Sequence, residues 1–123
     1  MPNIDPTLMK SNWYSGSYKV SKTREMHFLL IDSLYKKETD PVIFYLNDGP
    51  GYAAISSALN GLGPAYFNPL KREFVQLTRH WCNNATVIYL DGPPGTGFSK
   101  IGRNIDIISN EASYIKDAMS FIQ

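Results

Sequence analysis

Cysteine is almost absent from this sequence. Its 123 residues include one cysteine, Cys82. A single thiol cannot form an internal disulfide, so a reducing compartment fits the sequence. Residues 1–10 contain no charged segment followed by an apolar core, so we expect no signal peptide and an intracellular or organellar location rather than secretion. No apolar run approaches the roughly 20 residues that a membrane-spanning helix requires.

Charge of one sign is also scarce. The net charge is +1, with 12 basic and 11 acidic residues. This balance argues against nucleic acid or an anionic membrane as the main partner. The densest basic group is interrupted by Glu73, which indicates a solvated surface; its members are Lys71, Arg72, Arg79 and His80. We expect neither a metal nor a cofactor. With 43% hydrophobic and 19% charged residues, the composition is that of a globular chain with room for one domain.

Two apolar segments end in loops rich in glycine and proline. Residues 42–46 run into Asn-Asp-Gly-Pro-Gly at 47–51, and residues 85–90 run into Asp91 and a second such loop. Continuous apolar runs of this length predict strands buried on both faces of an α/β sheet. Ligands bind at the carboxyl ends of such strands, where a glycine N–H can approach an oxyanion.

The remaining segments predict a hairpin and two helices. Residues 17–20 and 26–33 alternate as an antiparallel β-hairpin would, and a polar connection follows at 34–40. Residues 53–60 predict a short helix closed by glycine. A longer helix should open at residues 109–111. We expect its apolar face to pack on the sheet, and that face contains Ile108, Ala112, Ile115, Ala118, Met119 and Ile122.

The loop at residues 92–97 superficially matches a phosphate-binding loop. Its letters are Gly-Pro-Pro-Gly-Thr-Gly, and Ser99 follows. However, Phe98 stands where such a loop has its lysine, and Lys100 comes two residues too late to reach the same place. Nucleotide binding is therefore disfavoured.

Five blocks resemble, in order and spacing, the N-terminal part of serine carboxypeptidases. They are residues 13–20, 27–33, 40–51, 61–64 and 81–99. That family has an α/β-hydrolase fold and removes C-terminal residues from peptides. The resemblance implies a tail at residues 1–12 and a partial domain at 13–123. Its fold would be an incomplete α/β-hydrolase-type sheet with an N-terminal β-hairpin, two buried strands and one or two helices.

The family's nucleophile is not recognisable in this sequence. Serine carboxypeptidases need a Gly-x-Ser-x-Gly-type elbow followed by Asp and His, and no serine here lies in such a pattern. His27 lies within a strand pattern and His80 lies beside Trp81, positions typical of structural histidines. We therefore expect no catalytic residue in this chain.

The resemblance does carry over two recognition residues. By their place in the family's Asn-Gly-Gly-Pro-Gly turn, Asn47 would hold the substrate carboxylate and Gly49 would donate an oxyanion-hole N–H. Three positions depart from the family. Asp48 replaces a glycine and brings a negative charge towards an anionic substrate end, Tyr52 replaces a disulfide-bonded cysteine, and Gly61 replaces an acidic residue.

Two functions follow, and both involve other polypeptides. Two all-apolar strands with few helices should expose a sheet face and edge, which other protein chains would cover. The first expectation is a non-catalytic, serine-carboxypeptidase-like subunit of a larger assembly. The alternative is the N-terminal part of an active serine carboxypeptidase whose triad lies on another chain.

Overall fold

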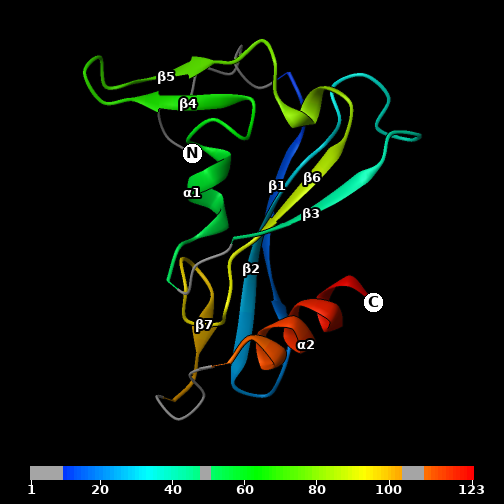
Figure 1. Cartoon of the computed structure of the whole chain (residues 1–123), viewed down its shortest axis with the longest axis vertical. Helices are drawn as coiled ribbons and strands as arrows, with labels where there is room; N and C mark the ends of the chain where they lie inside the picture. The colour runs from blue at the N-terminus through cyan, green and yellow to red at the C-terminus, as the bar shows by residue number, and fades with distance from the viewer. Residues whose placement is uncertain (1–9, 48–50, 104–109) are drawn as a thin grey trace.

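The main element of the fold is a mixed β-sheet (Figure 1). The computed structural model describes residues 10–47, 51–103 and 110–123. The sheet follows the order β1-β2-β6-β3, and β7 also pairs with β2. β1 and β2 are antiparallel, β2 and β6 are antiparallel, and β6 and β3 are parallel. The strands span Trp13–Lys19 (β1), Arg24–Ile31 (β2), Val42–Leu46 (β3), Thr86–Leu90 (β6) and Lys100–Ile101 (β7). The predicted α/β class is confirmed.

The N-terminal hairpin forms as predicted, with a longer first strand and a second strand that begins two residues earlier. Its register pairs Trp13 with Ile31 and Lys19 with Glu25. The Ser21 hydroxyl accepts hydrogen bonds from the backbone N–H groups of Thr23 and Arg24, at 3.3 and 3.1 Å. These bonds stabilise the tight connection because a serine side chain can replace backbone partners in a turn.

The connection between β3 and β6 contains a helix and a second, smaller sheet. α1 (Ala54–Ala58) falls within the predicted helix at 53–60. β4 (Ala65–Asn68) and β5 (Glu73–Gln76) form an antiparallel pair that the sequence reading missed. The short 3₁₀ helix η2 (Trp81–Asn83) then leads into β6. A helical crossover is the usual way to join parallel strands such as β3 and β6.

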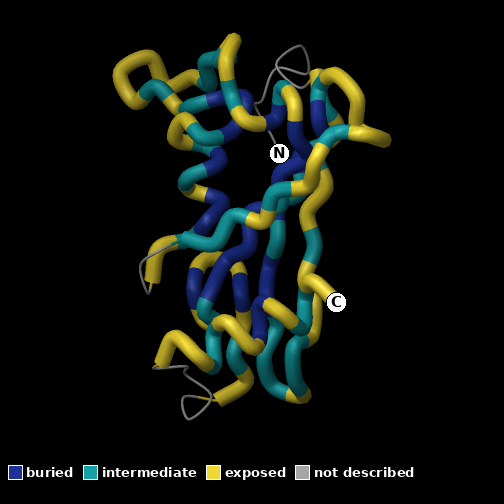
Figure 2. The backbone as a smooth tube through the Cα atoms, turned by 45° about the vertical axis from the view of Figure 1, so that its right-hand side comes forward, coloured by how far each residue is buried: buried dark blue, intermediate teal, exposed yellow. Residues whose placement is uncertain are grey.

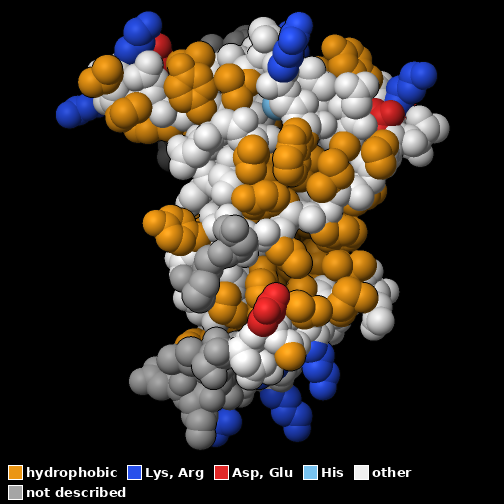
Figure 3. All heavy atoms as spheres, in the orientation of Figure 1, with side chains coloured by type: hydrophobic (Ala, Val, Ile, Leu, Met, Phe, Trp, Pro, Cys, Tyr) orange, Lys and Arg blue, Asp and Glu red, His pale blue; other side chains and the backbone are white. Residues whose placement is uncertain are grey.

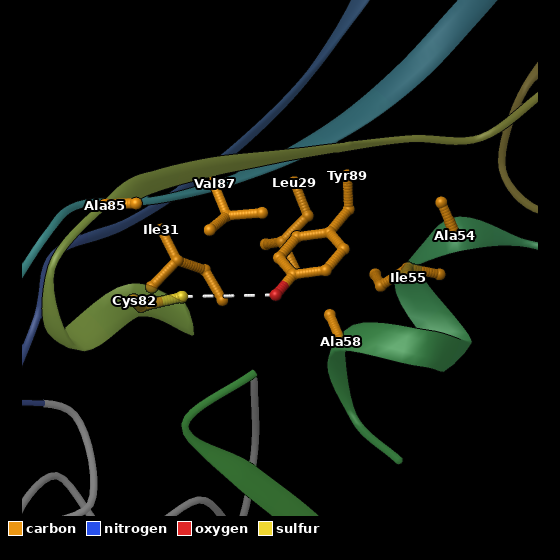
Figure 4. Close-up of a cluster of buried hydrophobic side chains, with 9 residues drawn as sticks. All are labelled: Leu29, Ile31, Ala54, Ile55, Ala58, Cys82, Ala85, Val87 and Tyr89. Carbon is orange, nitrogen blue, oxygen red and sulfur yellow. Dashed lines mark hydrogen bonds between the residues drawn. The ribbon is translucent and has the colours of Figure 1, made fainter. Parts of the chain in front are cut away.

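One face of the sheet forms the larger core, with α1 against it (Figure 4). Its members are Leu29, Ile31, Ala54, Ile55, Ala58, Cys82, Ala85, Val87 and Tyr89. The Cys82 sulfur lies 4.0 Å from the Tyr89 hydroxyl. Burial raises the pKa of Cys82 to about 11 and also raises the pKa of Tyr89. Both groups therefore stay protonated at neutral pH and act as core residues.

The other face is covered by α2 (Glu111–Ile122). The Asn110 side chain accepts a hydrogen bond from the Ser113 N–H at 2.9 Å, so the helix begins where its capping residue predicts. The predicted packing face is wrong, because Ile115, Met119 and Ile122 are exposed. Ala112 is also exposed, and Ile108 lies outside the described residues. The side chains that pack on the sheet are Tyr114, Ala118 and Phe121.

This shift in the packing face places a carboxylate against the sheet. Asp117 is 5% exposed, and its Oδ1 lies 2.9 Å from Arg24 Nη2 on β2. The ion pair fixes the rotation of α2 about its axis and turns Ile115 and Met119 towards solvent. The spacing of apolar residues along a helix does not show where a buried ion pair will form, so it could not predict this packing face.

The two apolar strands differ in burial (Figure 2). β6 is buried, as predicted. The prediction that β3 is buried on both faces is wrong: Val42 is 54% and Phe44 36% exposed. β3 is the outermost strand on its side of the described sheet, whereas β6 lies between β2 and β3. Position in the sheet, rather than composition, sets this difference.

Exposed apolar side chains gather over β3 and α2 on one side of the molecule (Figure 3). We call this set the β3–α2 patch, and its members are Val42, Phe44, Ile115, Met119 and Ile122. Neither described helix is long and apolar enough to cross a membrane.

Candidate functional site

The side chain of Asn47 is held on both sides at the end of β3. Its Oδ1 accepts a hydrogen bond from the Tyr45 hydroxyl at 3.1 Å, and its Nδ2 donates to the Tyr52 carbonyl at 3.2 Å. These contacts fix the orientation of the amide. Nδ2 carries two hydrogens, so one remains for a ligand. Asp48 and Gly49 lie outside the described residues, and the oxyanion role of Gly49 stays a prediction.

A hollow of about 480 Å³ adjoins this turn. It is lined by Tyr52, Ala53, Ser56, Ser57, Asn60 and Leu62. The Tyr45 hydroxyl lies 3.3 Å from Ser57 Oγ as well as near Asn47, so it links the hollow to the turn. Sequence reasoning did not single out Ser56, Ser57 or Asn60. Ser56 and Ser57 lie on α1, and Asn60 follows the end of this helix.

Gly61 follows the end of α1, where the backbone conformation favours glycine. Its φ is +116°. The next N–H groups close the helix, with Leu62 donating to the Ser57 carbonyl and Gly63 to the Ala58 carbonyl, both at 3.1 Å. An acidic side chain at position 61 would therefore require a strained backbone. Glycine at position 61 therefore suits this backbone, and the departure from the family pattern stays a prediction.

Asp91 connects four parts of the fold at the end of β6. It is fully buried. Its Oδ1 accepts a hydrogen bond from the Ile55 N–H at 3.1 Å, which ties it to α1. Its Oδ2 lies 3.2 Å from the Phe98 N and 3.1 Å from His27 Nδ1. A buried carboxylate is stable when donors surround it in this way.

Gly97 allows the loop after β6 to approach that carboxylate. Its φ is +59°, and a Cβ at this position would lie 2.5 Å from Asp91 Oδ2. The Ser99 hydroxyl donates to the Asp91 carbonyl and accepts from the His27 N–H, both at 2.7 Å. The residues that resemble a phosphate-binding loop therefore form hydrogen bonds with other groups of the protein itself.

His27 lies in a strand, as expected, but its ring bridges two polar side chains. Nε2 lies 2.9 Å from Ser15 Oγ, and Nδ1 faces Asp91. The Phe98 ring centroid is 5.2 Å from that of His27. Sequence reasoning missed this group because 64 residues separate His27 from Asp91. His80 is elsewhere, and burial lowers its pKa. No group of three His, Cys, Asp or Glu side chains in the described segments is placed to hold a metal ion.

The known proteins that match this chain belong to one family. A model of the family described as "Serine carboxypeptidase" matches residues 2–123. Carboxypeptidase Y of Schizosaccharomyces pombe is 34% identical over 111 residues, covering 89% of this chain and 11% of the relative. Carboxypeptidase Y of Saccharomyces cerevisiae is 32% identical over 121 residues, covering 98% of this chain and 22% of the relative.

A solved structure shows the same fold. The S. cerevisiae prohormone-processing carboxypeptidase Kex1Δp matches with a TM-score of 0.77 at 22% identity, over 98% of this chain and 28% of that chain. The present chain therefore spans between a tenth and about a quarter of the length of these relatives.

Proposed function

Because the chain belongs to the serine carboxypeptidase family, we propose that it supplies the substrate-carboxylate side of a carboxypeptidase active site. The observation that carries this proposal is the fixed amide of Asn47 at the carboxyl end of β3. The Ser, Asp and His of the reaction would come from another polypeptide segment. Release of C-terminal amino acids from peptides would then require both parts.

In this proposal Asn47 binds the terminal carboxylate of the peptide through the free hydrogen on Nδ2. Gly49 would donate its N–H to the oxygen of the scissile carbonyl as negative charge develops there. Asp48 would repel the substrate carboxylate and weaken binding of the acid form. The hollow beside α1 offers room for the C-terminal side chain, with Tyr52, which is 72% exposed, at its rim.

Replacing Asn47 with alanine tests this role. The assay uses the chain together with the polypeptide that carries the triad, a blocked dipeptide with a free carboxylate, and the matching dipeptide amide. We expect kcat/KM to fall by about 10- to 100-fold for the acid and much less for the amide, because one hydrogen bond to a charged group is lost. Asn12→Ala, which removes an exposed asparagine that precedes β1, is the control.

Equal losses for acid and amide would show that Asn47 supports the turn rather than binding carboxylate. Failure of the combined polypeptides to release any C-terminal residue would reject the carboxypeptidase proposal itself.

A second candidate function, that of a non-catalytic subunit, is favoured by the β3–α2 patch. Its exposed members would be buried by other chains of an assembly. We expect the chain alone to bind a hydrophobic dye and to self-associate, and the triple variant Val42→Thr, Ile115→Gln, Met119→Gln to do so several-fold less. Light scattering and dye fluorescence measure both effects. A monodisperse chain with weak dye binding would contradict the need for a covering partner.

A further inference from the structure

Three residues are hydrogen-bonded in the order that an activated serine uses. Ser15 Oγ lies 2.9 Å from His27 Nε2, and His27 Nδ1 lies 3.1 Å from Asp91 Oδ2. We propose that Ser15, His27 and Asp91 form a second reactive site, in which Ser15 is a nucleophile towards small apolar esters and organophosphonates. The site uses neither Asn47 nor Gly49 and does not depend on the proposed carboxypeptidase activity.

The two nitrogen contacts define the roles of the ring. With the proton on Nδ1 donated to Asp91, the lone pair of Nε2 faces the Ser15 hydroxyl and can accept its proton. The carboxylate is held in place by two further donors, the N–H groups of Ile55 and Phe98. The imidazole orientation is therefore fixed before any ligand arrives.

Burial decreases from Asp91 through His27 to Ser15. The Asp91 side chain is 0% and the His27 side chain 10% exposed, whereas Ser15 is exposed. A buried carboxylate and a shielded ring strengthen their mutual interaction in a low-dielectric setting. The exposed hydroxyl remains accessible to a substrate.

The edge of β1 offers donors for a developing oxyanion. Asp32 donates its N–H to the Asn12 carbonyl, and Val20 donates to the Arg24 carbonyl, so even-numbered residues pair with β2 in this hairpin. Because antiparallel pairing alternates, the N–H groups of Ser15 and the other odd-numbered residues of β1 point away from β2. β1 is the outermost strand on this side of the described sheet. These N–H groups can therefore face a bound carbonyl oxygen.

An apolar surface next to the ring defines the substrate class. Phe98 packs 5.2 Å from His27 between ring centroids and is 64% exposed. It can contact a small alkyl or aryl group of an ester. Because Ser15 and Phe98 are both exposed, the substrate class that we infer is a small, uncharged ester rather than a peptide, which would need a more extended set of contacts.

The reaction follows from these positions. Ser15 Oγ forms a bond to the ester carbonyl carbon while its proton passes to His27 Nε2. Collapse of the tetrahedral adduct breaks the bond to the leaving oxygen, which takes the proton from His27. Water then attacks the acyl group on Ser15 by the same route, releases the carboxylic acid and restores the hydroxyl.

The test uses the whole chain with p-nitrophenyl acetate and, separately, a fluorophosphonate. We expect one adduct, mapped to Ser15 by peptide mass spectrometry. Ser15→Ala should abolish it, and His27→Gln should slow acylation by about 100-fold or more, since general-base catalysis contributes that much. Ser17→Ala is the matched control: Ser17 lies on the same strand, opposite His27 in the register, and its loss should leave the rate unchanged.

A spectroscopic measurement separates this role from simple support of the fold. The His27 Nδ1 proton should give a downfield NMR signal in the original chain that Asp91→Asn removes while the β-sheet signals persist. A folded chain whose Ser15 stays unmodified would overturn the proposal regardless of how the variants behave. So would modification of Ser15 and Ser17 at equal rates, or an unchanged rate in His27→Gln.

Discussion

Replacing Arg24 with methionine is expected to lower the free energy of unfolding by about 3 kcal/mol, because Asp117 would be left as a buried, uncompensated carboxylate. The Arg24 Nη2 to Asp117 Oδ1 distance is 2.9 Å, and the two side chains are 26% and 6% exposed. Arg24 Nε and Asp117 Oδ2 have no hydrogen-bond partner in the described structure, so the two side chains are joined through Nη2 and Oδ1. Urea unfolding followed by circular dichroism measures the change.

The double variant Arg24→Met, Asp117→Leu should recover most of this loss, because an apolar pair of similar volume needs no compensation. Lys19→Met is the matched control on the same hairpin. Its ion pair with Glu25 is 3.9 Å long and the Lys19 side chain is 77% exposed, so we expect almost no change. A double variant as unstable as Arg24→Met would show that the arginine stem, rather than its charge, stabilises α2.

Replacing Gly97 with alanine is expected to destabilise the fold by about 2–4 kcal/mol, through overpacking and an unfavourable backbone conformation. The added Cβ would lie 2.5 Å from Asp91 Oδ2 and 2.8 Å from the Ala53 Cβ. The loop would have to move, which would lengthen the bond from the Phe98 N–H to Asp91. Thermal unfolding measures the loss, and the NMR signal of His27 reports whether the carboxylate has moved.

Gly61→Ala is the control for the destabilisation caused by backbone strain alone. Gly61 has a φ of +116° but no atom within 4 Å of its hypothetical Cβ, so only conformational strain of about 1–2 kcal/mol should appear. Equal destabilisation in the two variants would mean that the loop after β6 yields without cost and that Asp91 is less firmly held than its contacts indicate.

Local patterns in the sequence were sufficient to predict several elements of the fold. The alternation in residues 17–20 and 26–33 predicted the β1–β2 hairpin, and the asparagine at position 110 predicted the start of α2. The β4–β5 pair escaped because each strand has only four residues, too few to show a period. The Ser21 turn and the glycine-closed end of α1 were predictable because each depends on residues adjacent in the chain.

The candidate site divides in the same way. Asn47 was found from the motif, and its contacts with Tyr45 and Tyr52 come from residues within five positions. The hollow beside Asn47 depends on the packing of α1 against the sheet. The alignment of Ser15, His27 and Asp91 joins β1, β2 and the residue that follows β6, so no single segment of the sequence shows it.

By itself, the sequence determined the family, the strands β3 and β6 and the absence of the family's nucleophile elbow, because each is a contiguous pattern of residue types. Only the tertiary structure decided which apolar residues are buried. β3 and β6 have similar compositions, yet within the described sheet β6 is flanked by strands on both sides and β3 on one, so Val42 and Phe44 remain exposed. The ion pair between Arg24 and Asp117 likewise sets which face of α2 packs, since the burial of a charge depends on a partner 93 residues away.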